Sequence, residues 1–235
     1  MFNDRIIVAL DVPNEGEAEA LLRAFGIIKP FVKVGMQLFY ATGPKWVRQL
    51  KERGYPVFLD LKLHDIPQTV FSAAQSVGRL EVDLLTVHIA GGREMLRQAI
   101  EGVKSVQKSR TTKVIGITQL TSTDERILNE EIGIQGTVAA SVAHYAKLGK
   151  EAGLDGVVCS GWEARHIKQA FGESFLAVTP GIRLTDDVGD QKRVMTPQAA
   201  LAEGADYLVI GRPITRADAP ANVYRQIIDS LDANA

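Results

Sequence analysis

The chain has 235 residues, of which 46% are hydrophobic and 23% charged, so its apolar side chains suffice for a full core. Its 27 basic and 28 acidic residues give a net charge of −1, which argues against non-specific binding to nucleic acid or a membrane surface. The single cysteine, Cys159, excludes an intrachain disulfide and is expected to fill space in the core. No segment approaches the roughly 20 apolar residues that span a bilayer, and the N-terminus lacks the apolar stretch of a signal peptide. We therefore expect a soluble, cytoplasmic protein.

Short apolar runs alternate with helix-like stretches along the chain. The expected strands are Ile6–Asp11, Phe31–Gly35, Pro56–Lys62, Asp83–His88, Lys113–Thr118, Gly156–Ser160, Phe175–Pro180 and Tyr207–Gly211. The expected helices between them include Glu15–Phe25, Pro44–Arg53, Thr69–Leu80, Arg93–Val106, Thr137–Ala152 and Pro197–Glu203. Because strands and helices alternate, the pattern predicts a parallel sheet.

Dividing 235 residues among eight strand–helix units gives about 29 residues per unit, which predicts a (β/α)8 TIM barrel. We expect residues 1–235 to form this barrel as a single domain of the α/β class. The alternative is a doubly wound open sheet, which often carries a glycine-rich turn after its first strand. Here Asp11 is followed by Val12 and Pro13 instead. Polar residues at the strand ends then become candidates for an active site.

The third expected strand carries charges of opposite sign on one face. Side chains alternate across a strand, so Phe58, Asp60 and Lys62 share one face while the leucines between them share the other. Buried charges must be paired, or they cost several kcal/mol. Asp65 adds a third charge directly after this strand. Acid, ammonium and acid at this spacing predict a reaction centre, and a purely structural ion pair is the alternative.

Two earlier strands contribute further charges. Lys33 lies in the middle of the second strand, where lysine is rarely buried without a partner. An exposed edge position is the alternative, but a closed barrel has no edge. Asp11 ends the first strand, where it could instead cap a helix or form a turn. We expect Asp11, Lys33, Asp60 and Lys62 to alternate in charge at one mouth of the barrel.

The later strand ends suggest where a substrate would bind. Thr121 and Ser122 follow the fifth strand and could bind a polar ring or cap a helix, whereas His88 has no assigned role. The seventh and eighth strands lead into a polar loop from Arg183 to Gln191 and into Gly211–Arg212. Loops at these places in barrels often bind phosphate, because glycine lets backbone amides approach the anion and arginine grips two oxygens.

A metal site is not expected. The four histidines lack the close spacing of metal ligands. Asp11, Asp60 and Asp65 could hold a magnesium ion, but Lys62 lies between them in the pattern and supplies positive charge itself.

The run Asp60–Pro67, DLKLHDIP, resembles the D-x-K-x-x-D-I-P signature of the orotidine 5′-monophosphate decarboxylase family. Ile7–Asp11, Lys33–Gly35, Thr179–Arg183 and Gly211–Ile214 match the family in the same order. Related sugar-phosphate decarboxylases and synthases share the D-x-K-x-x-D core. The added Ile66 and Pro67, with the Gly211–Ile214 turn, indicate the orotidylate branch.

The resemblance implies decarboxylation of orotidine 5′-monophosphate to uridine 5′-monophosphate in pyrimidine biosynthesis, with no metal or organic cofactor. Lys62 would protonate pyrimidine C6, Asp60 would lie beside the substrate carboxylate, and Lys33 would complete the charged array. Asp65 would enter the partner subunit's site in a homodimer. The other substrate-binding residues implied are Asp11 and Lys33 at the ribose, Thr121 and Ser122 at the pyrimidine, Arg183, Gln191, Gly211 and Arg212 at the phosphate, and Ile66 and Thr69 next to Asp65. The alternatives are a magnesium-dependent sugar-phosphate enzyme and a catalytically silent nucleotide-binding barrel.

Overall fold

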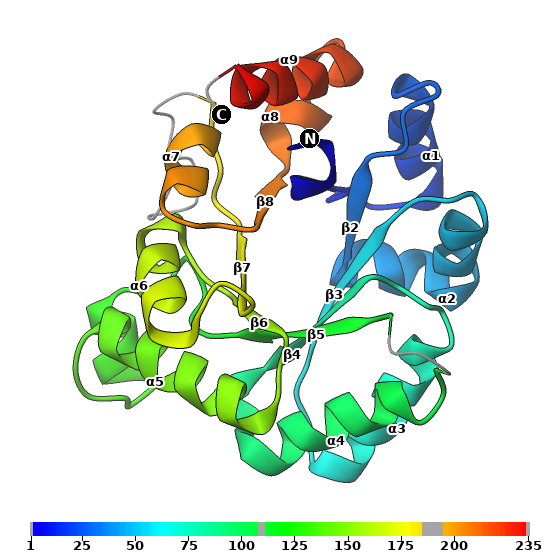
Figure 1. Cartoon of the computed structure of the whole chain (residues 1–235). Helices are drawn as coiled ribbons and strands as arrows, with labels where there is room; N and C mark the ends of the chain where they lie inside the picture. The colour runs from blue at the N-terminus through cyan, green and yellow to red at the C-terminus, as the bar shows by residue number, and fades with distance from the viewer. Residues whose placement is uncertain (1, 108–110, 185–194, 234–235) are drawn as a thin grey trace.

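Eight parallel strands close into a barrel in the computed structural model, which describes residues 2–107, 111–184 and 195–233. Each strand pairs with the next in sequence, and β8 pairs with β1 to complete the ring (Figure 1). The strands are β1 (Ile6–Ala9), β2 (Phe31–Gly35), β3 (Val57–Leu63), β4 (Leu84–His88), β5 (Lys113–Ile117), β6 (Gly156–Val158), β7 (Leu176–Thr179) and β8 (Tyr207–Ile210). The predicted (β/α)8 barrel is confirmed, and the open sheet is excluded.

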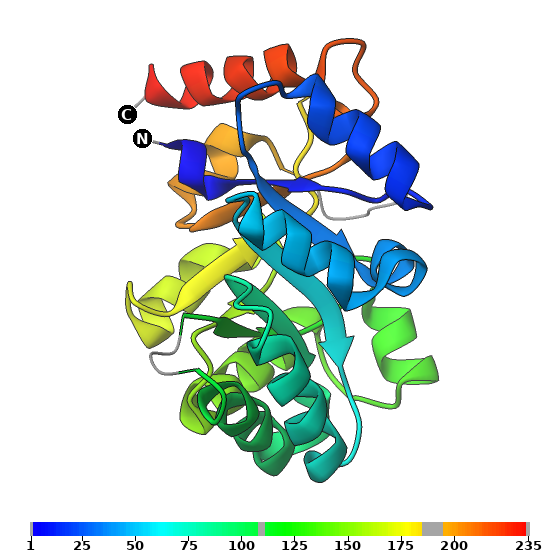
Figure 2. The same cartoon turned by 90° about the vertical axis from the view of Figure 1, so that its right-hand side faces the viewer.

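Helices surround the barrel on its outside (Figure 1). They are α1 (Glu15–Ala24), α2 (Met36–Glu52), α3 (Pro67–Gly78), α4 (Gly92–Lys104), α5 (Val138–Ala152), α6 (Gly161–Phe171), α7 (Pro197–Ala202), the short α8 (Arg212–Thr215) and α9 (Pro220–Asp232). Single turns η1 (Phe2–Arg5), η2 (Ile89–Gly91) and η3 (Ile127–Glu131) complete the described elements. The first turn, η1, packs against the last helix, α9 (Figure 2).

The predicted element boundaries need three corrections. Several strands end earlier than expected, so Asp11 and Gly211 lie in the loops that follow β1 and β8. The expected helix Pro44–Arg53 is the second half of α2, which begins at Met36 and is interrupted at Gly43, where φ is 73°. Pro44 suits the first turn after this break, because its missing N–H would be unpaired there anyway. The helices named from the sequence also included no counterpart of α9 or of α6, whose Ser160 forms a capping box with Glu163.

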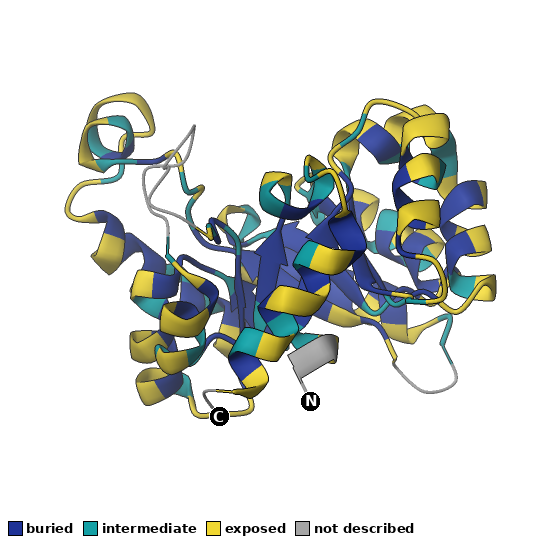
Figure 3. Ribbon diagram, turned by 90° about the horizontal axis from the view of Figure 1, so that it is seen from above, coloured by how far each residue is buried: buried dark blue, intermediate teal, exposed yellow. Residues whose placement is uncertain are grey.

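The strands present one face to the barrel interior and the other to the helices. Seven large or branched side chains fill the interior, namely Ile7, Phe31, Phe58, Leu84, Ile115, Val178 and Val209. A larger core fills the space between the strands and the helices, so the strands at the centre are buried on both faces (Figure 3). Each inward position recurs every two residues along a strand. The next inward residues after Phe31 and Phe58 are therefore Lys33 and Asp60, which bring charge to the C-terminal mouth.

At the opposite end of the barrel, an aspartate directly precedes each of β4, β6 and β8. Asp83, Asp155 and Asp206 accept hydrogen bonds from backbone amides of the preceding strand, at Val57, Val114 and Ala177, with distances of 2.7–2.8 Å. Asp83 also pairs with Lys51, and Asp206 pairs with the buried Lys168. These carboxylates fasten neighbouring strands together where they begin. Among the described residues, no helix is long and apolar enough to cross a membrane.

Candidate active site

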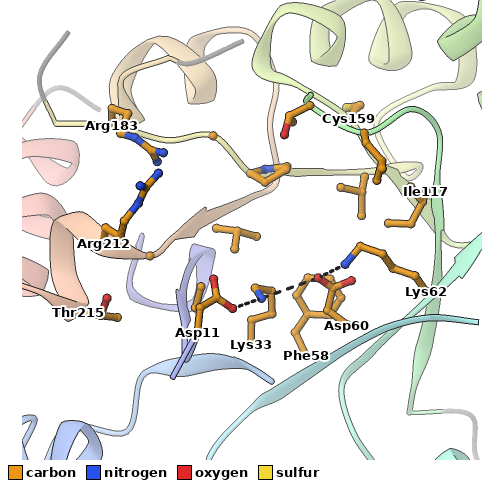
Figure 4. Close-up of a pocket in the computed structure, with 18 of the residues that line it drawn as sticks. Asp11, Lys33, Phe58, Asp60, Lys62, Ile117, Cys159, Arg183, Arg212 and Thr215 are labelled. Atoms are coloured by element: carbon orange, nitrogen blue, oxygen red, sulfur yellow. Dashed lines mark hydrogen bonds and ion pairs between the residues drawn. The ribbon is translucent and has the colours of Figure 1, made fainter. Parts of the chain in front are cut away.

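A cavity of about 470 Å³ opens at the C-terminal ends of the strands (Figure 4). Its volume lies within the range typical of small-molecule sites, roughly 300–1,000 Å³. The lining includes Asp11, Lys33, Asp60 and Lys62 on one side and Arg183, Gly211 and Arg212 on another. The cavity therefore lies where barrel enzymes carry their active sites.

Four charged side chains form a continuous array along one wall of the cavity. Lys33 Nζ lies 2.8 Å from Asp11 Oδ1 and 3.8 Å from Asp60 Oδ2. Lys62 Nζ lies 2.8 Å from the same Oδ2 atom of Asp60 (Figure 4). The signs alternate from Asp11 through Lys33 and Asp60 to Lys62, as predicted from the strand pattern. Each lysine therefore has a carboxylate partner, which offsets the cost of removing its charge from water.

The array is partly buried but accessible from the cavity. The side chains of Lys33 and Asp60 are 11% and 12% exposed, whereas that of Lys62 is 25% exposed. Lys33 does not occupy an exposed edge, because β2 is paired on both sides. The ammonium of Lys62 borders an open cavity, a position that a purely structural ion pair would not require.

Local features of the chain make room for this array. Asp11 does not cap α1, because Asn14 does so by accepting a hydrogen bond from the amide of Glu17. Asp11 is therefore available to Lys33. A Cβ atom on Gly35 would lie 3.2 Å from Lys33 Nζ and 3.5 Å from Asp11 Oδ1. Glycine at the end of β2 thus leaves space for the ion pair.

Asp65, Ile66 and Thr69 lie outside the cavity lining within this chain. All three residues are exposed, and Ile66 is 67% exposed. Oδ1 of Asp65 accepts a hydrogen bond of 2.7 Å from the amide of Ile66, directly before α3 begins at Pro67. The ion pair found for Lys62 within the described residues is with Asp60.

Two arginines border the cavity on the side away from Lys62. The guanidinium groups of Arg183 and Arg212 point toward each other there (Figure 4). Gly211 precedes α8 and lines the cavity beside Arg212. Thr215 and Arg216 line this end as well, although the sequence pattern did not single them out. The spacing of Arg216 four residues after Arg212, which places both on one helical face, is the signal that could have found it. Gln191 lies outside the described residues.

A third part of the cavity is formed after β5 and β6. Thr121 lines it as expected, whereas Ser122 is exposed and does not. Gln119 also lines it and donates a hydrogen bond to Ser141 Oγ. Cys159 is buried in the core, as predicted, and also borders the cavity. Such a mixed polar and apolar wall suits a planar ring with polar substituents.

His88 ends β4 beside this charged array. Its ring centroid lies 5.3 Å from that of His64. Burial lowers the pKa of His88, and the neighbouring charges of His64 and Lys62 lower that pKa further. Together these effects favour the neutral form of the imidazole. Among the described residues, no group of three or more His, Cys, Asp or Glu side chains is arranged to hold a metal ion.

A closed barrel with paired acids and bases at its C-terminal mouth has the architecture of a (β/α)8-barrel enzyme. A sequence profile of the Orotidine 5′-phosphate decarboxylase / HUMPS family matches residues 4–227. The chain therefore belongs to this family.

Individual relatives resemble the chain over nearly its whole length. Orotidine 5′-phosphate decarboxylase of Bacillus caldolyticus is 54% identical over 224 residues, which cover 94% of this chain and 92% of that protein. The protein of the same name from Bacillus cereus (strain Q1) is 50% identical over 225 residues, 94% of each chain. The crystal structure of orotidine 5′-phosphate decarboxylase from Lactobacillus acidophilus superposes with a TM-score of 0.89 at 37% identity, covering 97% of this chain and 99% of that one.

Proposed function

We propose that this chain decarboxylates orotidine 5′-monophosphate to uridine 5′-monophosphate in pyrimidine biosynthesis, without a metal or organic cofactor. One observation carries the proposal: the Lys62 ammonium lies 2.8 Å from Asp60 at the wall of the cavity. Arg183 and Arg212 line another part of the same cavity. One part of the cavity thus offers a proton donor, and another offers cations for a phosphate. Membership of the family supports the same reaction.

The chemistry requires a cation at the reacting carbon. When carbon dioxide leaves C6, the electron pair stays in the plane of the ring, where the π system cannot delocalise it. Without a cofactor there is no electron sink for this pair. An ammonium beside C6 stabilises the developing negative charge and then supplies a proton. In the proposed step the C6–carboxyl bond breaks, its electrons remain on C6, and a proton from Lys62 Nζ forms the new C6–H bond.

The neighbours of Lys62 hold and complement it. Asp60 would accept a hydrogen bond from Lys62 and lie beside the substrate carboxylate as that group departs. Lys33 would balance the charge of Asp60 and, with Asp11, bind the ribose.

Lys62 alone cannot supply the required acceleration. Very slow reactions require on the order of 20 kcal/mol of barrier lowering. One preorganised donor contributes about 3–4 kcal/mol. The remainder must include positioning and binding energy drawn from the distant phosphate. Arg183, Gly211 and Arg212 would hold that phosphate, and Thr121 would bind the pyrimidine.

The active form would be a cytoplasmic homodimer. Asp65, Ile66 and Thr69 are exposed in the single chain, and they follow the strand that carries Asp60 and Lys62. A second copy placed against this mouth would receive Asp65 into its cavity. A third carboxylate near Lys62 would then help to fix the ammonium beside C6.

The test is to incubate the purified protein with orotidine 5′-monophosphate and a metal chelator, and to follow the pyrimidine absorbance. We expect rapid conversion to uridine 5′-monophosphate that the chelator does not slow. Activity that is lost on chelation would favour a magnesium-dependent enzyme. Binding of uridine 5′-monophosphate without turnover, by a folded dimer, would favour a silent nucleotide-binding barrel.

A further inference from the structure

Thr86 is a fully buried polar residue in the middle of β4, with 0% of its surface exposed. Leu84, two residues earlier, packs in the barrel interior, so Thr86 also points inward. A buried hydroxyl must find hydrogen-bond partners, or it destabilises the fold. Its partners are therefore informative about why a threonine stands among the apolar residues of this strand.

The strand opposite Thr86 is irregular at the charged array. Leu59 pairs with Leu85, and Leu63 pairs with Val87, so four residues along β3 correspond to two along β4. Lys62 lies within this bulge with φ at 52°, in the left-handed region that residues other than glycine seldom adopt. Such a conformation persists where surrounding contacts hold it in place.

The Thr86 hydroxyl contacts both residues at the centre of the array. It accepts a hydrogen bond of 2.9 Å from the backbone amide of Lys62. It also lies 2.9 Å from Oδ1 of Asp60, to which it donates. An ionised carboxylate can only accept, and a hydroxyl has one proton to donate. The direction of both hydrogen bonds is therefore determined.

The two carboxylate oxygens of Asp60 have different partners. Oδ1 is occupied by Thr86, whereas Oδ2 faces Lys62 at 2.8 Å and Lys33 at 3.8 Å. The hydroxyl thus selects which carboxylate oxygen the lysines meet. It also supplies a partner for the Lys62 amide where the bulge interrupts the pairing of β3 with β4.

We infer that Thr86 is a positioning residue, which fixes both the Asp60 carboxylate and the left-handed backbone of Lys62 so that the ammonium is aimed at the reacting carbon. The inference rests on the proposed function, because it assigns Thr86 a part in that same proton transfer. Thr86 acts through Asp60 and Lys62, and it would not touch the substrate phosphate. Its loss should therefore lower kcat and leave KM nearly unchanged.

The decisive variant is Thr86→Val, which keeps the shape of the side chain and removes the hydroxyl. Without it, Oδ1 of Asp60 and the Lys62 amide lose their partner in a buried place, and both groups can shift. Because misplacement of a catalytic group by about 1 Å costs on the order of 100-fold in rate, we expect kcat to fall by about that factor. Thr86→Ser retains the hydroxyl and should recover most of the lost activity.

Thr112 provides a matched control at the opposite end of the barrel. It is also 0% exposed, and its hydroxyl donates to the carbonyl of Val82 and accepts from Gln107. Thr112→Val therefore removes the same kind of doubly bonded hydroxyl from a place remote from the cavity. We expect it to lower the melting temperature while kcat and KM stay at the wild-type values.

Wild type and variants are compared with orotidine 5′-monophosphate in one assay, with kcat, KM and the melting temperature measured for each. A large loss of kcat in Thr86→Val, recovered in Thr86→Ser and absent in Thr112→Val, supports the positioning role. Wild-type kcat in Thr86→Val, or an equal loss in Thr86→Ser, overturns it. An inactive wild type would instead contradict the proposed function. If Thr86→Val does not fold, Thr86→Ala replaces it under the same two criteria.

Discussion

Aspartate–lysine pairs occur at both ends of this barrel, and their surroundings separate their roles. At the end where the strands begin, Asp83 and Asp206 each accept a backbone amide of the neighbouring strand as well as a lysine. At the mouth, Oδ2 of Asp60 faces two lysines beside an open cavity. The same two residue types therefore fasten strands together at one end and line an open cavity at the other.

This difference shows that an ion pair is informative about function only together with its remaining contacts. At the end where the strands begin, the carboxylates of Asp83 and Asp206 stabilise the fold by accepting strand amides, and a lysine neutralises the charge of each. Lys62 instead has its ammonium on a cavity wall, and its backbone is strained into the left-handed region. Backbone strain of this kind concentrates at functional sites.

The largest effect is expected from Lys62→Ala, compared with Lys51→Ala at the opposite end. The two lysines have similar exposure, 25% and 22%, and each pairs with an aspartate. Lys62→Ala should abolish detectable turnover, because the proposed proton donor is lost. Lys51→Ala should lower stability while kcat is retained. Steady-state kinetics and thermal unfolding of both variants test this, and full activity in a folded Lys62→Ala protein would remove Lys62 from the mechanism.

Arg212→Ala should produce the next largest effect. If binding energy from the phosphate drives the reaction, kcat/KM should fall by about 1,000-fold, since a strong charge-assisted contact is lost from the transition state. The fold should remain intact, because Arg212 is exposed. Arg165→Ala, which removes an exposed arginine paired with Glu203, is the control. A change of no more than twofold in kcat/KM for Arg212→Ala would show that remote binding is unimportant.

Asp206→Asn should affect stability and spare catalysis. Lys168 is 6% exposed and pairs with Asp206, while it also donates to the carbonyls of Glu173 and Phe175. Removing one partner of a buried ion pair costs on the order of 3 kcal/mol, which denaturant unfolding would measure. The kcat of the folded protein should equal that of the wild type. A lowered kcat with unchanged stability would reverse the roles assigned to the two ends.

The smallest effect concerns His88 and pH. Burial lowers the pKa of His88, with contributions from His64 and Lys62, so the folded protein binds this proton less readily than the unfolded chain. Stability should therefore decline as the pH falls below about 6.5, the ordinary histidine value, because the unfolded state takes up the proton first. His88→Gln should make this decline shallower, as measured by unfolding between pH 7.5 and 5.5. The exposed His166→Gln serves as control, and equal slopes in both variants would contradict the account.

Much of the charged array could be predicted from the sequence, because its geometry follows from two regular features of the fold. Strand alternation placed Phe58, Asp60 and Lys62 on one face, and the parallel order of the strands brought Asp11 and Lys33 to the same mouth. Both expectations are confirmed by the structure. Lys33 and Lys62 could be identified as members of a charged array because a lysine inside a closed barrel needs a carboxylate partner.

Other features depend on contacts that no local pattern records. The bulge at Lys62 does not interrupt the alternation of apolar and charged residues, so the sequence reads as a regular strand through it. The positioning role proposed for Thr86 depends on its place in β4, opposite that bulge and in contact with Asp60. Gln119 reaches the cavity through the folding of the loop that follows β5. A residue that enters the cavity of a second copy, as proposed for Asp65, cannot be identified from the contacts within one chain.

In the proposed reaction, carbon dioxide leaves directly and the proton arrives at C6. The most direct test is to convert orotidine 5′-monophosphate in D₂O with a metal chelator present, and to examine the uridine 5′-monophosphate by proton NMR. Because the ammonium protons of Lys62 exchange with solvent, we expect deuterium at C6 and ordinary hydrogen at C5. Deuterium at C5, or a substrate that remains intact, would contradict it.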